Sequence, residues 1–435
     1  MKSLLLILCI VWTQNIFGQT NYFPPINGTW ETTDPNSLGW CMDELQPLYQ
    51  YLDTTNSKGF IVLKDGKIVL EKYFGNFTQD SSWYWASAGK SLTAFAVGIA
   101  QQKGLLSIDN PVSNYLGDGW TSCTKAQEEK ITVRHLLMMS SGLDDNTSNP
   151  FCNEPSCLTY KAEPGTRWAY NTGVYSLLIK IIETITGQDY NLFISKNIGI
   201  PTGMKGLWIS AQGELYITKV QTMARFGLLI LNHGVWANND ILQDSNYFQA
   251  MVNTSQPMNQ AYGFLWWLNG KQTFMVPGLP IQLPGSLVPN APQDAYFAMG
   301  KYGQIICIVP SQNLVVIRMG DDPGNNEQLV SPIYLDKIYT YLNKIICTPA
   351  SVQSSKKVES VVIYPNPVIN SIIWANPNNL SIKTIEFYNA HGQLLQTIQP
   401  KRQFADVSSF KPGTYIALFK DQNHVLIGQS QFIKI

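Results

Sequence analysis

Segments typical of β-strands lie at both ends of the first 350 residues, and segments typical of helices fill the middle. Apolar, β-prone residues flank the turn pair Asp65-Gly66, which predicts a β-hairpin over residues 60–74. Three later strands and an amphipathic helix are expected over residues 295–299, 304–309, 313–319 and 331–346. Because the two strand groups must pair to cover their apolar faces, we predict one antiparallel sheet flanked by helices.

The segments between the two strand groups are predicted to be helical. Their apolar periodicity and their stop signals give helices over residues 91–102, 133–139, 174–186 and 223–232. These four expected helices predict a helical lobe inserted between strands of the sheet. A cleft between the sheet and this lobe is the expected place for a functional site.

The composition changes near residue 350. Residues 351–357 are polar and predict a linker. From residue 358 to 435, short alternating strands follow one another with turn residues between them, which predicts a small β-sandwich. The expected fold class is therefore α+β with a C-terminal β-sandwich.

The first 18 residues are typical of a secretory signal peptide. Lys2 gives a positive start, residues 4–12 are apolar, and Gly18 suits a cleavage site. This run is too short to span a bilayer, and no other stretch approaches 18 apolar residues. We expect an exported protein with no transmembrane segment and a first domain over residues 19–350.

The charge balance argues against nucleic acid as a partner. Lys plus Arg number 30 and Asp plus Glu number 30, so the chain has no basic surplus. The chain also lacks G-x-x-x-x-G-K-[ST] and G-x-G-x-x-G, so nucleotide chemistry is not indicated. We expect the chemistry to need no cofactor and no metal.

Six cysteines follow the expected signal peptide, and an even number in an exported protein indicates disulfides. Cys152 and Cys157 are close in sequence and form the most plausible pair. The other four are Cys41, Cys123, Cys307 and Cys347, and the sequence does not choose among their pairings. A metal site is the competing interpretation, but the four histidines are not spaced as ligands beside any cysteine pair.

Ser87 and Lys90 form an S-x-x-K motif at the start of a long apolar helix. Residues three apart share one helix face, so a neutral amine would lie beside the hydroxyl and could accept its proton. The motif alone is weak, because Ser122-Lys125 and Ser354-Lys357 repeat it. Only the Ser87 copy opens such a helix.

The residues around this motif resemble the serine β-lactamase-like family. The resemblance rests on "YWASAGKSLTAFAVGIA", "GLLSIDNPVSNYL", "ITVRHLLMMSSGL", "PGTRWAYNTGVYSLL" and "MARFGLLILNHGVW", in that order, and covers about residues 40–346. The family contains class C β-lactamases, D,D-peptidases, esterases and 6-aminohexanoate oligomer hydrolases. The resemblance implies that Ser87 is the nucleophile and that Lys90 activates it.

The family's second motif, Y-x-N, implies a role for Tyr170 as general base or acid. A neighbourhood rich in lysine is expected to lower the pKa of its hydroxyl. Thr172 stands where the family usually has an Asn that touches the substrate amide. This departure argues against a β-lactam or peptidoglycan substrate.

The third motif, K-T-G or H-x-G, is similar to Lys301-Tyr302-Gly303, followed by Gln304. The resemblance implies that Lys301 and Gly303 contact the substrate. It also implies that the N–H groups of Ser87 and Gln304 form the oxyanion hole. Lys301 as a solvated turn residue is the alternative. Residues 276–292, which contain five prolines, are expected to form a semi-rigid loop over the site.

A Ser-His-Asp hydrolase is the rival chemistry, but G-x-S-x-G is absent and none of the four histidines suits that role. We therefore expect hydrolysis of an ester, an amide or a peptide-like substrate through an acyl-enzyme on Ser87. The alternatives are a β-lactamase or D,D-peptidase, and a catalytically inactive binding protein of the same fold.

The C-terminal residues resemble type IX secretion sorting domains. The resemblance rests on "VIYPNPVIN", "IEFYNAHGQLL", "VSSFKPGTYIALF" and the terminal "FIKI", and spans nearly all of residues 358–435. It implies the type IX secretion machinery as a partner. It also implies passage through the periplasm and outer membrane, and a secreted or cell-surface location. An ordinary carbohydrate-binding or spacer sandwich is the alternative.

Overall fold

The computed structural model describes residues 21–210, 214–324, 330, 332–347, 359–375, 380–389, 393–400, 402–422 and 426–435. The chain divides into two compact units, Met1–Cys347 and Thr348–Ile435. The expected signal peptide over residues 1–18 and the expected linker over 351–357 lie outside the described residues.

The first unit is built on a six-stranded antiparallel sheet. Its strands lie in the order β2-β1-β13-β12-β11-β8. In that order their bounds are Lys67–Tyr73, Ser57–Lys64, Leu314–Gly320, Gln304–Val309, Tyr296–Gly300 and Trp267–Leu268. Strand β1 pairs with β13, so the prediction that the early and late strands form one antiparallel sheet is confirmed.

The predicted hairpin is strands β1 and β2. Asp65 has a φ of 53° and Gly66 a φ of 81°, so both central turn residues are left-handed. This is the geometry of a type I′ turn, which matches the twist of the two strands and for which Asp-Gly is well suited. The turn pair therefore pairs β1 with the edge strand β2 and leaves the other side of β1 to pair with β13.

The helices α1 to α11 and the short strands outside the main sheet complete the unit. The helices span Leu45–Thr54, Gly89–Gln102, Ser113–Leu116, Lys125–Glu128, Val133–Leu137, Thr172–Thr186, Tyr190–Ile194, Ile200–Thr202, Val220–Leu231, Ser245–Met251 and Pro332–Ile345. Strands β3, β4, β5, β6, β7, β9 and β10 span Ser82–Tyr84, Gly206–Ser210, Glu214–Lys219, Val235–Trp236, Asn239–Asp240, Thr273–Val276 and Leu279–Pro284.

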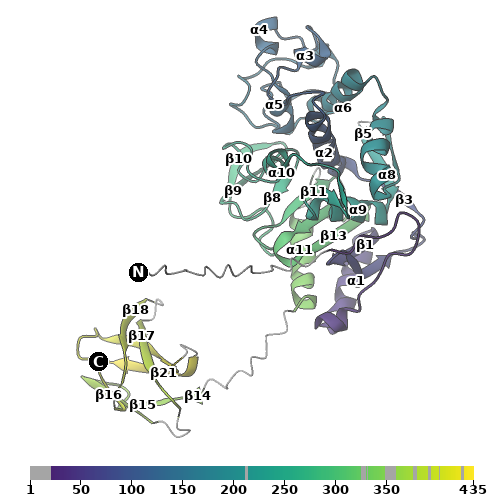
Figure 1. Cartoon of the computed structure of the whole chain (residues 1–435). Helices are drawn as coiled ribbons and strands as arrows, with labels where there is room; N and C mark the ends of the chain where they lie inside the picture. The colour runs from purple at the N-terminus through teal and green to yellow at the C-terminus, as the bar shows by residue number, and fades with distance from the viewer. Residues whose placement is uncertain are drawn as a thin grey trace, which may run out of the picture. The chain divides into compact units, whose positions relative to one another are not determined.

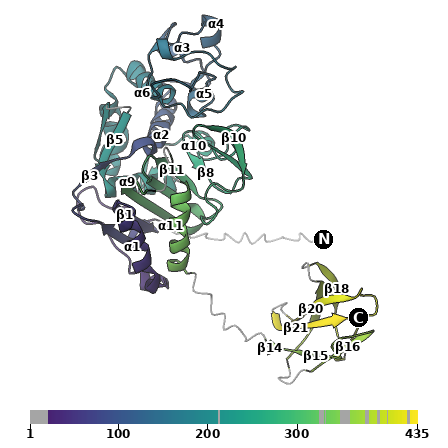
Figure 2. The ribbon, with the colours of Figure 1, turned by 180° about the vertical axis from the view of Figure 1, so that it is seen from behind.

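Helices cover both faces of the main sheet. Helix α9 packs across β1, β12 and β13, and its Gly227 approaches Ile306 of β12. The next residue, Cys307, lies 3.0 Å from the hydroxyl of Tyr339 on α11, and Figure 2 shows α11 over the strands. Strand β12 is therefore buried on both faces, which explains its uninterrupted apolar sequence.

Helices α3, α4, α5 and α6 gather at the end of the unit away from α1 and α11 (Figure 1). Helix α2 lies between this helical lobe and the sheet, since it contacts both α6 and β11. The N-terminal end of α2, which carries the S-x-x-K motif, therefore lies where the lobe meets the sheet.

Among the described residues of the first unit, two disulfides form, Cys41–Cys347 and Cys152–Cys157. The predicted Cys152–Cys157 pair is confirmed. Cys123 and Cys307 stay free thiols, so the even count did not mean that every cysteine is paired. The Cys41–Cys347 bond ties the segment before α1 to the end of α11, where the unit ends.

The described residues of the second unit form two β-sheets around a separate apolar core. The strands β14 to β21 span Glu359–Ser360, Val362–Tyr364, Ser371–Ala375, Thr384–Asn389, Leu394–Ile398, Phe404–Asp406, Gly413–Lys420 and Leu426–Lys434. One sheet has the order β14-β21-β20-β17-β18 and the other β15-β16-β19. Trp374 from the small sheet and Phe387, Phe419 and Phe432 from the large one share the core, as expected for a sandwich.

Across the described part of the chain, no helix combines the length and the apolar character needed to span a membrane.

Candidate active site

Ser87 lies in a one-turn 3-10 helix, Ala86–Ala88, between strand β3 and helix α2. The turn is anchored by Trp85, which is fully buried and whose Nε1 donates to Thr218 Oγ1 at 2.6 Å. Ala86 has a φ of 45°, a left-handed conformation that is uncommon for alanine. The chain therefore bends sharply just before Ser87, and the serine remains partly exposed at the start of α2.

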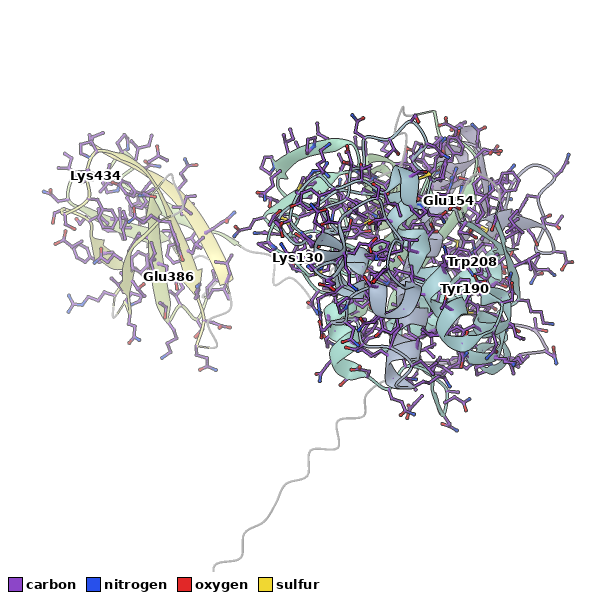
Figure 3. All side chains as sticks on the ribbon, turned by 90° about the horizontal axis from the view of Figure 1, so that it is seen from above. Lys130, Glu154, Tyr190, Trp208, Glu386 and Lys434 are labelled. Carbon is purple, nitrogen blue, oxygen red and sulfur yellow. A yellow bond between two sulfur atoms is a disulfide. The ribbon has the colours of Figure 1, made fainter. Side chains whose placement is uncertain are left out.

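An aromatic pair supports the start of α2. A Cβ built on Gly89 would lie 2.8 Å from the Trp208 ring, so only glycine allows this approach. Trp208 packs edge-on against Tyr190 with ring centroids 5.4 Å apart, and Figure 3 shows the two side by side. Tyr190 also donates from its hydroxyl to Thr93 Oγ1 at 3.1 Å. These contacts hold the helix that carries the nucleophile.

Lys90 lies one turn after Ser87, and its Nζ is 2.9 Å from Ser87 Oγ. The side chain is buried, with a relative exposure of 2%, and forms no salt bridge within the described residues. Its amine lies over the rings of Tyr175 and Tyr170, at 4.2 and 5.0 Å from their centroids. Burial lowers the pKa of Lys90 to about 7, because the charged form loses its water. A large share of this amine is therefore neutral near pH 7.

Tyr170 reaches the same place from the segment before α6. Asn171 is the N-cap of α6, where its Oδ1 accepts from the backbone N–H of Val174 at 3.1 Å. The ring of Tyr170 stacks on Trp267 with centroids 5.9 Å apart and meets Tyr262 edge-on. Helix capping and aromatic packing together fix the hydroxyl beside Ser87.

Burial raises the pKa of Tyr170 well above its usual value, while a hydrogen bond with Ser87 acts in the opposite direction. The expectation of a lowered pKa was wrong, because burial of the Tyr170 hydroxyl disfavours its charged form. Tyr170 is thus a protonated hydroxyl near neutral pH. In this state it can donate a proton or a hydrogen bond to a reacting group.

The turn between β11 and β12 meets the Ser87 turn at Gly300. A Cβ built on Gly300 would collide with the carbonyl oxygen of Trp85 and would lie 3.0 Å from the backbone nitrogen of Ser87. Lys301, the next residue, is exposed, and its Nζ lies 4.7 Å from the centroid of the Tyr302 ring. Gly300 therefore brings its backbone close to the nucleophile, and sequence reasoning missed this contact.

The rest of this turn faces the interior. Gly303 has a φ of 68° and packs against Arg318 and Tyr334. The side chain of Gln304 is buried and donates from Nε2 to the carbonyl of Gly320 at 2.6 Å. Strand β12, which begins at Gln304, nevertheless packs against the 3-10 turn that carries Ser87. The oxyanion role of the Gln304 N–H stays a prediction.

Arg318 of β13 holds this turn in place and was also missed by sequence reasoning. Its guanidinium is fully buried and donates to the carbonyl oxygens of Tyr302, Gly303 and Thr55. Because Tyr302 is left-handed as well, with a φ of 63°, the turn needs such an anchor. Arginine within an apolar strand pattern was the signal that could have pointed to it.

Thr172 is the first residue of α6 and is half-buried. The next residue, Gly173, packs so closely on the carbonyl of Cys152 that a Cβ there would collide with it. The Cys152–Cys157 loop therefore lies against the helix start that follows Tyr170. A contact of Thr172 with substrate stays a prediction.

A cavity of about 360 Å³ opens beside Tyr170. One wall comes from the segment 145–170, and the other comes from strands β9 and β10. The two strands pair across the two-residue turn Pro277-Gly278, with Gly278 at a φ of 77°. The expected proline-rich loop over residues 276–292 is thus in part a hairpin.

Within the described ranges, no three His, Cys, Asp or Glu side chains cluster so as to hold a metal ion.

Residues 53–339 match the family described as Beta-lactamase, which is well over half of the chain. The chain belongs to the β-lactamase family. Members of this family are typically serine hydrolases, and the pairing of Ser87 with Lys90 lies within the matched region.

Two relatives and one solved structure illustrate how far the β-lactamase family likeness extends. An uncharacterized protein of Alkalihalophilus pseudofirmus is 25% identical over 318 residues, which is 64% of this chain and 87% of that protein. PbpX of Bacillus subtilis, provisionally named a penicillin-binding protein, is 30% identical over 179 residues, which is 38% of this chain and 44% of that protein. A Bacillus anthracis protein, provisionally assigned as a 6-aminohexanoate-dimer hydrolase, shares the fold. It has a TM-score of 0.57 and 18% identity, over 75% of this chain and 89% of that one.

Residues 362–434 match the Secretion system C-terminal sorting domain. The second unit is therefore a sorting domain of the type IX kind rather than a carbohydrate-binding or spacer module. It directs the protein through type IX secretion to the cell surface or the exterior.

Proposed function

We propose that this β-lactamase-family protein is a secreted serine hydrolase that cleaves an ester or an amide through an acyl-enzyme on Ser87. The observation that carries the proposal is the 2.9 Å contact between Ser87 Oγ and the buried Nζ of Lys90. A lysine whose pKa falls to about 7 can accept a proton at neutral pH, and a serine hydroxyl needs such a base to attack a carbonyl.

In the acylation step, Ser87 Oγ forms a bond to the substrate carbonyl carbon as its proton passes to Lys90. The carbonyl oxygen takes up the electron pair and becomes an oxyanion. When the carbonyl re-forms, the bond to the leaving group breaks, and that group takes a proton from the Tyr170 hydroxyl. Lys90 then returns the proton to Tyr170. In the deacylation step, water attacks the acyl-enzyme carbonyl as its proton passes to Lys90, and Ser87 leaves with a proton from Tyr170, which releases the carboxylic acid product.

The oxyanion needs backbone N–H donors, and Ser87 at the start of α2 supplies one. The second donor is proposed to come from the β11–β12 turn, residues 300–304. The contact of Gly300 with the Ser87 turn supports this proposal. The sequence resemblance assigns this role to the Gln304 N–H and places Lys301 and Gly303 at the substrate. For Lys301, the exposed side chain without a described contact to the catalytic group favours the alternative of a solvated turn residue.

The substrate class is proposed to be an ester or a linear amide rather than a β-lactam. Thr172 and Tyr302 replace residue types that the family uses toward β-lactams and cell-wall peptides. The names of similar proteins point both ways, since one solved structure is provisionally named a 6-aminohexanoate-dimer hydrolase and one relative is provisionally named a penicillin-binding protein. Hydrolysis of a chromogenic cephalosporin as fast as that of a 4-nitrophenyl ester would favour the β-lactamase alternative.

The nucleophile can be tested by labelling the secreted protein with a small fluorophosphonate and locating the adduct by mass spectrometry. The chain supplies a matched control in Ser122, which lies in a second S-x-x-K copy whose Lys125 pairs with Asp118 at 2.7 Å instead of with the serine. We expect wild type and Ser122→Ala to be labelled and Ser87→Ala to be unlabelled. Labelling of Ser87→Ala at the wild-type level would exclude Ser87, and an unlabelled wild type would favour the inactive binding protein.

A further inference from the structure

The cavity beside Tyr170 is shaped by one apolar and one polar wall. Met275, Val276, Leu279 and Pro280 of the β9–β10 hairpin form the apolar wall. Its volume of about 360 Å³ is at the small end of the range for ligand pockets. Tyr170 lines this cavity and also belongs to the catalytic group, so a substrate that reaches Ser87 can extend past Tyr170 into the cavity.

The charges on the polar wall are neutralised by pairing. Arg167 is ion-paired with Asp145, and Lys161 is ion-paired with Asp144 at 2.6 Å. A charged ligand group would have to compete with these partners or lie unpaired beside apolar side chains. The cavity therefore favours a ligand with no net charge.

Two side chains of the cavity wall keep N–H groups that lack an acceptor. Nη1 of Arg167 and Nε1 of Trp168 are buried and have no hydrogen-bond partner among the described residues. Trp168 as a whole has a relative exposure of 4%. Buried donors are rarely left without an acceptor, so a carbonyl oxygen brought by a ligand, with a small shift of these side chains, would complete their hydrogen bonds.

The proposed function decides which part of a substrate meets this cavity. Tyr170 is protonated and gives its proton to the leaving group, so the leaving group must lie against Tyr170. Tyr170 also lines the cavity. The acyl part then lies on the opposite side of Ser87, toward the β11–β12 turn.

We propose that the cavity binds the leaving-group portion of the substrate. It selects an uncharged alcohol or amine portion with one apolar face and an amide or ester carbonyl. The inference rests on the proposed function, because it uses the proton donation by Tyr170. It adds a substrate class, namely neutral esters or amides whose leaving group carries a further carbonyl.

A series of acetate esters tests the proposal, because all of them form the same acetyl-enzyme and share one deacylation step. Differences in kcat/KM then report binding and departure of the leaving group. The leaving groups are phenols substituted at position 4 with acetamido, methyl, carboxymethyl or 2-aminoethyl groups. We expect kcat/KM to be highest for the acetamido ester and about tenfold lower for both charged esters.

A matched pair of variants locates the effect in the cavity. Leu279 and Ile281 lie on the same hairpin strand and are both exposed, at 39% and 52%, but Leu279 alone lines the cavity. Leu279→Asp should abolish the preference for the acetamido ester and raise the relative rate of the 2-aminoethyl ester. Ile281→Asp should keep the wild-type order of substrates.

The outcomes separate this inference from the proposed function. If the fluorophosphonate labels Ser87 but the four esters react equally, or if the two variants behave alike, the leaving-group role of the cavity is wrong and the hydrolase proposal stands. If Ser87 is not labelled and no ester is cleaved, both proposals fail.

Discussion

The two turns that meet at Ser87 are held in different ways. The Ser87 turn is fixed by buried aromatic side chains, and the lysine that follows it is itself buried, at 2% exposure. The β11–β12 turn is fixed from behind by the Arg318 guanidinium, and its own lysine, Lys301, points to solvent. Desolvation lowers the pKa of Lys90 to about 7, and it acts only on a buried amine. Burial of the lysine, rather than its nearness to the serine in sequence, makes Lys90 the candidate base.

Replacing each lysine by methionine gives the largest expected difference between the two turns. Lys90→Met removes the base, and we expect kcat/KM for a 4-nitrophenyl ester to fall by about 10³-fold. For Lys301→Met we expect a change of less than about threefold, because the exposed amine has no described contact with the catalytic group. A loss of about tenfold or more in Lys301→Met would instead support the substrate-binding role that the resemblance assigns to Lys301.

Alanine at the two glycines of the second turn should separate a catalytic effect from a structural one. In Gly300→Ala the new Cβ collides with the carbonyl of Trp85, so the Ser87 turn must shift, and we expect a loss of about 10²-fold in kcat/KM. In Gly303→Ala the left-handed residue is strained, at about 1–2 kcal/mol, and the folded enzyme keeps most of its activity.

Activity and thermal unfolding of both glycine variants check this difference. The reverse result, a Gly303→Ala variant that folds normally but has lost activity, would assign the close approach to Gly303 and support the oxyanion role of the neighbouring Gln304 N–H.

The smallest expected effect is on stability. Between about pH 7 and 10.5, the unfolded chain binds a proton at Lys90 that the folded chain has released, so stability rises with pH across this window. Lys90→Met lacks the pH-dependent change in stability that comes from the Lys90 amine, while all other titrating groups are the same as in wild type. We expect the variant to gain a few degrees in Tm over wild type at pH 7 and to lose that advantage toward pH 10. A Tm difference that is constant with pH would show that the amine is not desolvated.

The sequence was sufficient to predict those contacts and elements whose geometry is determined by the spacing of residues close together in the chain. The S-x-x-K spacing predicts the Ser87–Lys90 contact because the 3-10 turn that carries Ser87 runs directly into helix α2, which carries Lys90. The turn pair Asp65-Gly66 predicts the hairpin, and the strand expected over residues 304–309 is β12 with the same bounds.

The contacts that sequence reasoning missed join segments far apart in the chain. The meeting of Gly300 with the Ser87 turn depends on where β11 ends relative to β3, which only the assembled sheet determines. Arg318 and the Cys41–Cys347 bond depend in the same way on tertiary packing. The pKa of Tyr170 was mispredicted because burial, which a sequence does not display, raises it and outweighs the lowering effect of the hydrogen bond with Ser87.

The pH dependence of Ser87 acylation tests the central claim most directly. The rate constant for labelling by an uncharged fluorophosphonate should be followed from about pH 5.5 to 9, with folding checked at each pH. Because the neutral amine of Lys90 is the active form, we predict a rate that rises with pH through a midpoint near 7, with no such rise in Lys90→Met. A labelling rate that is flat across this range, or the same rise in Lys90→Met, would contradict the account.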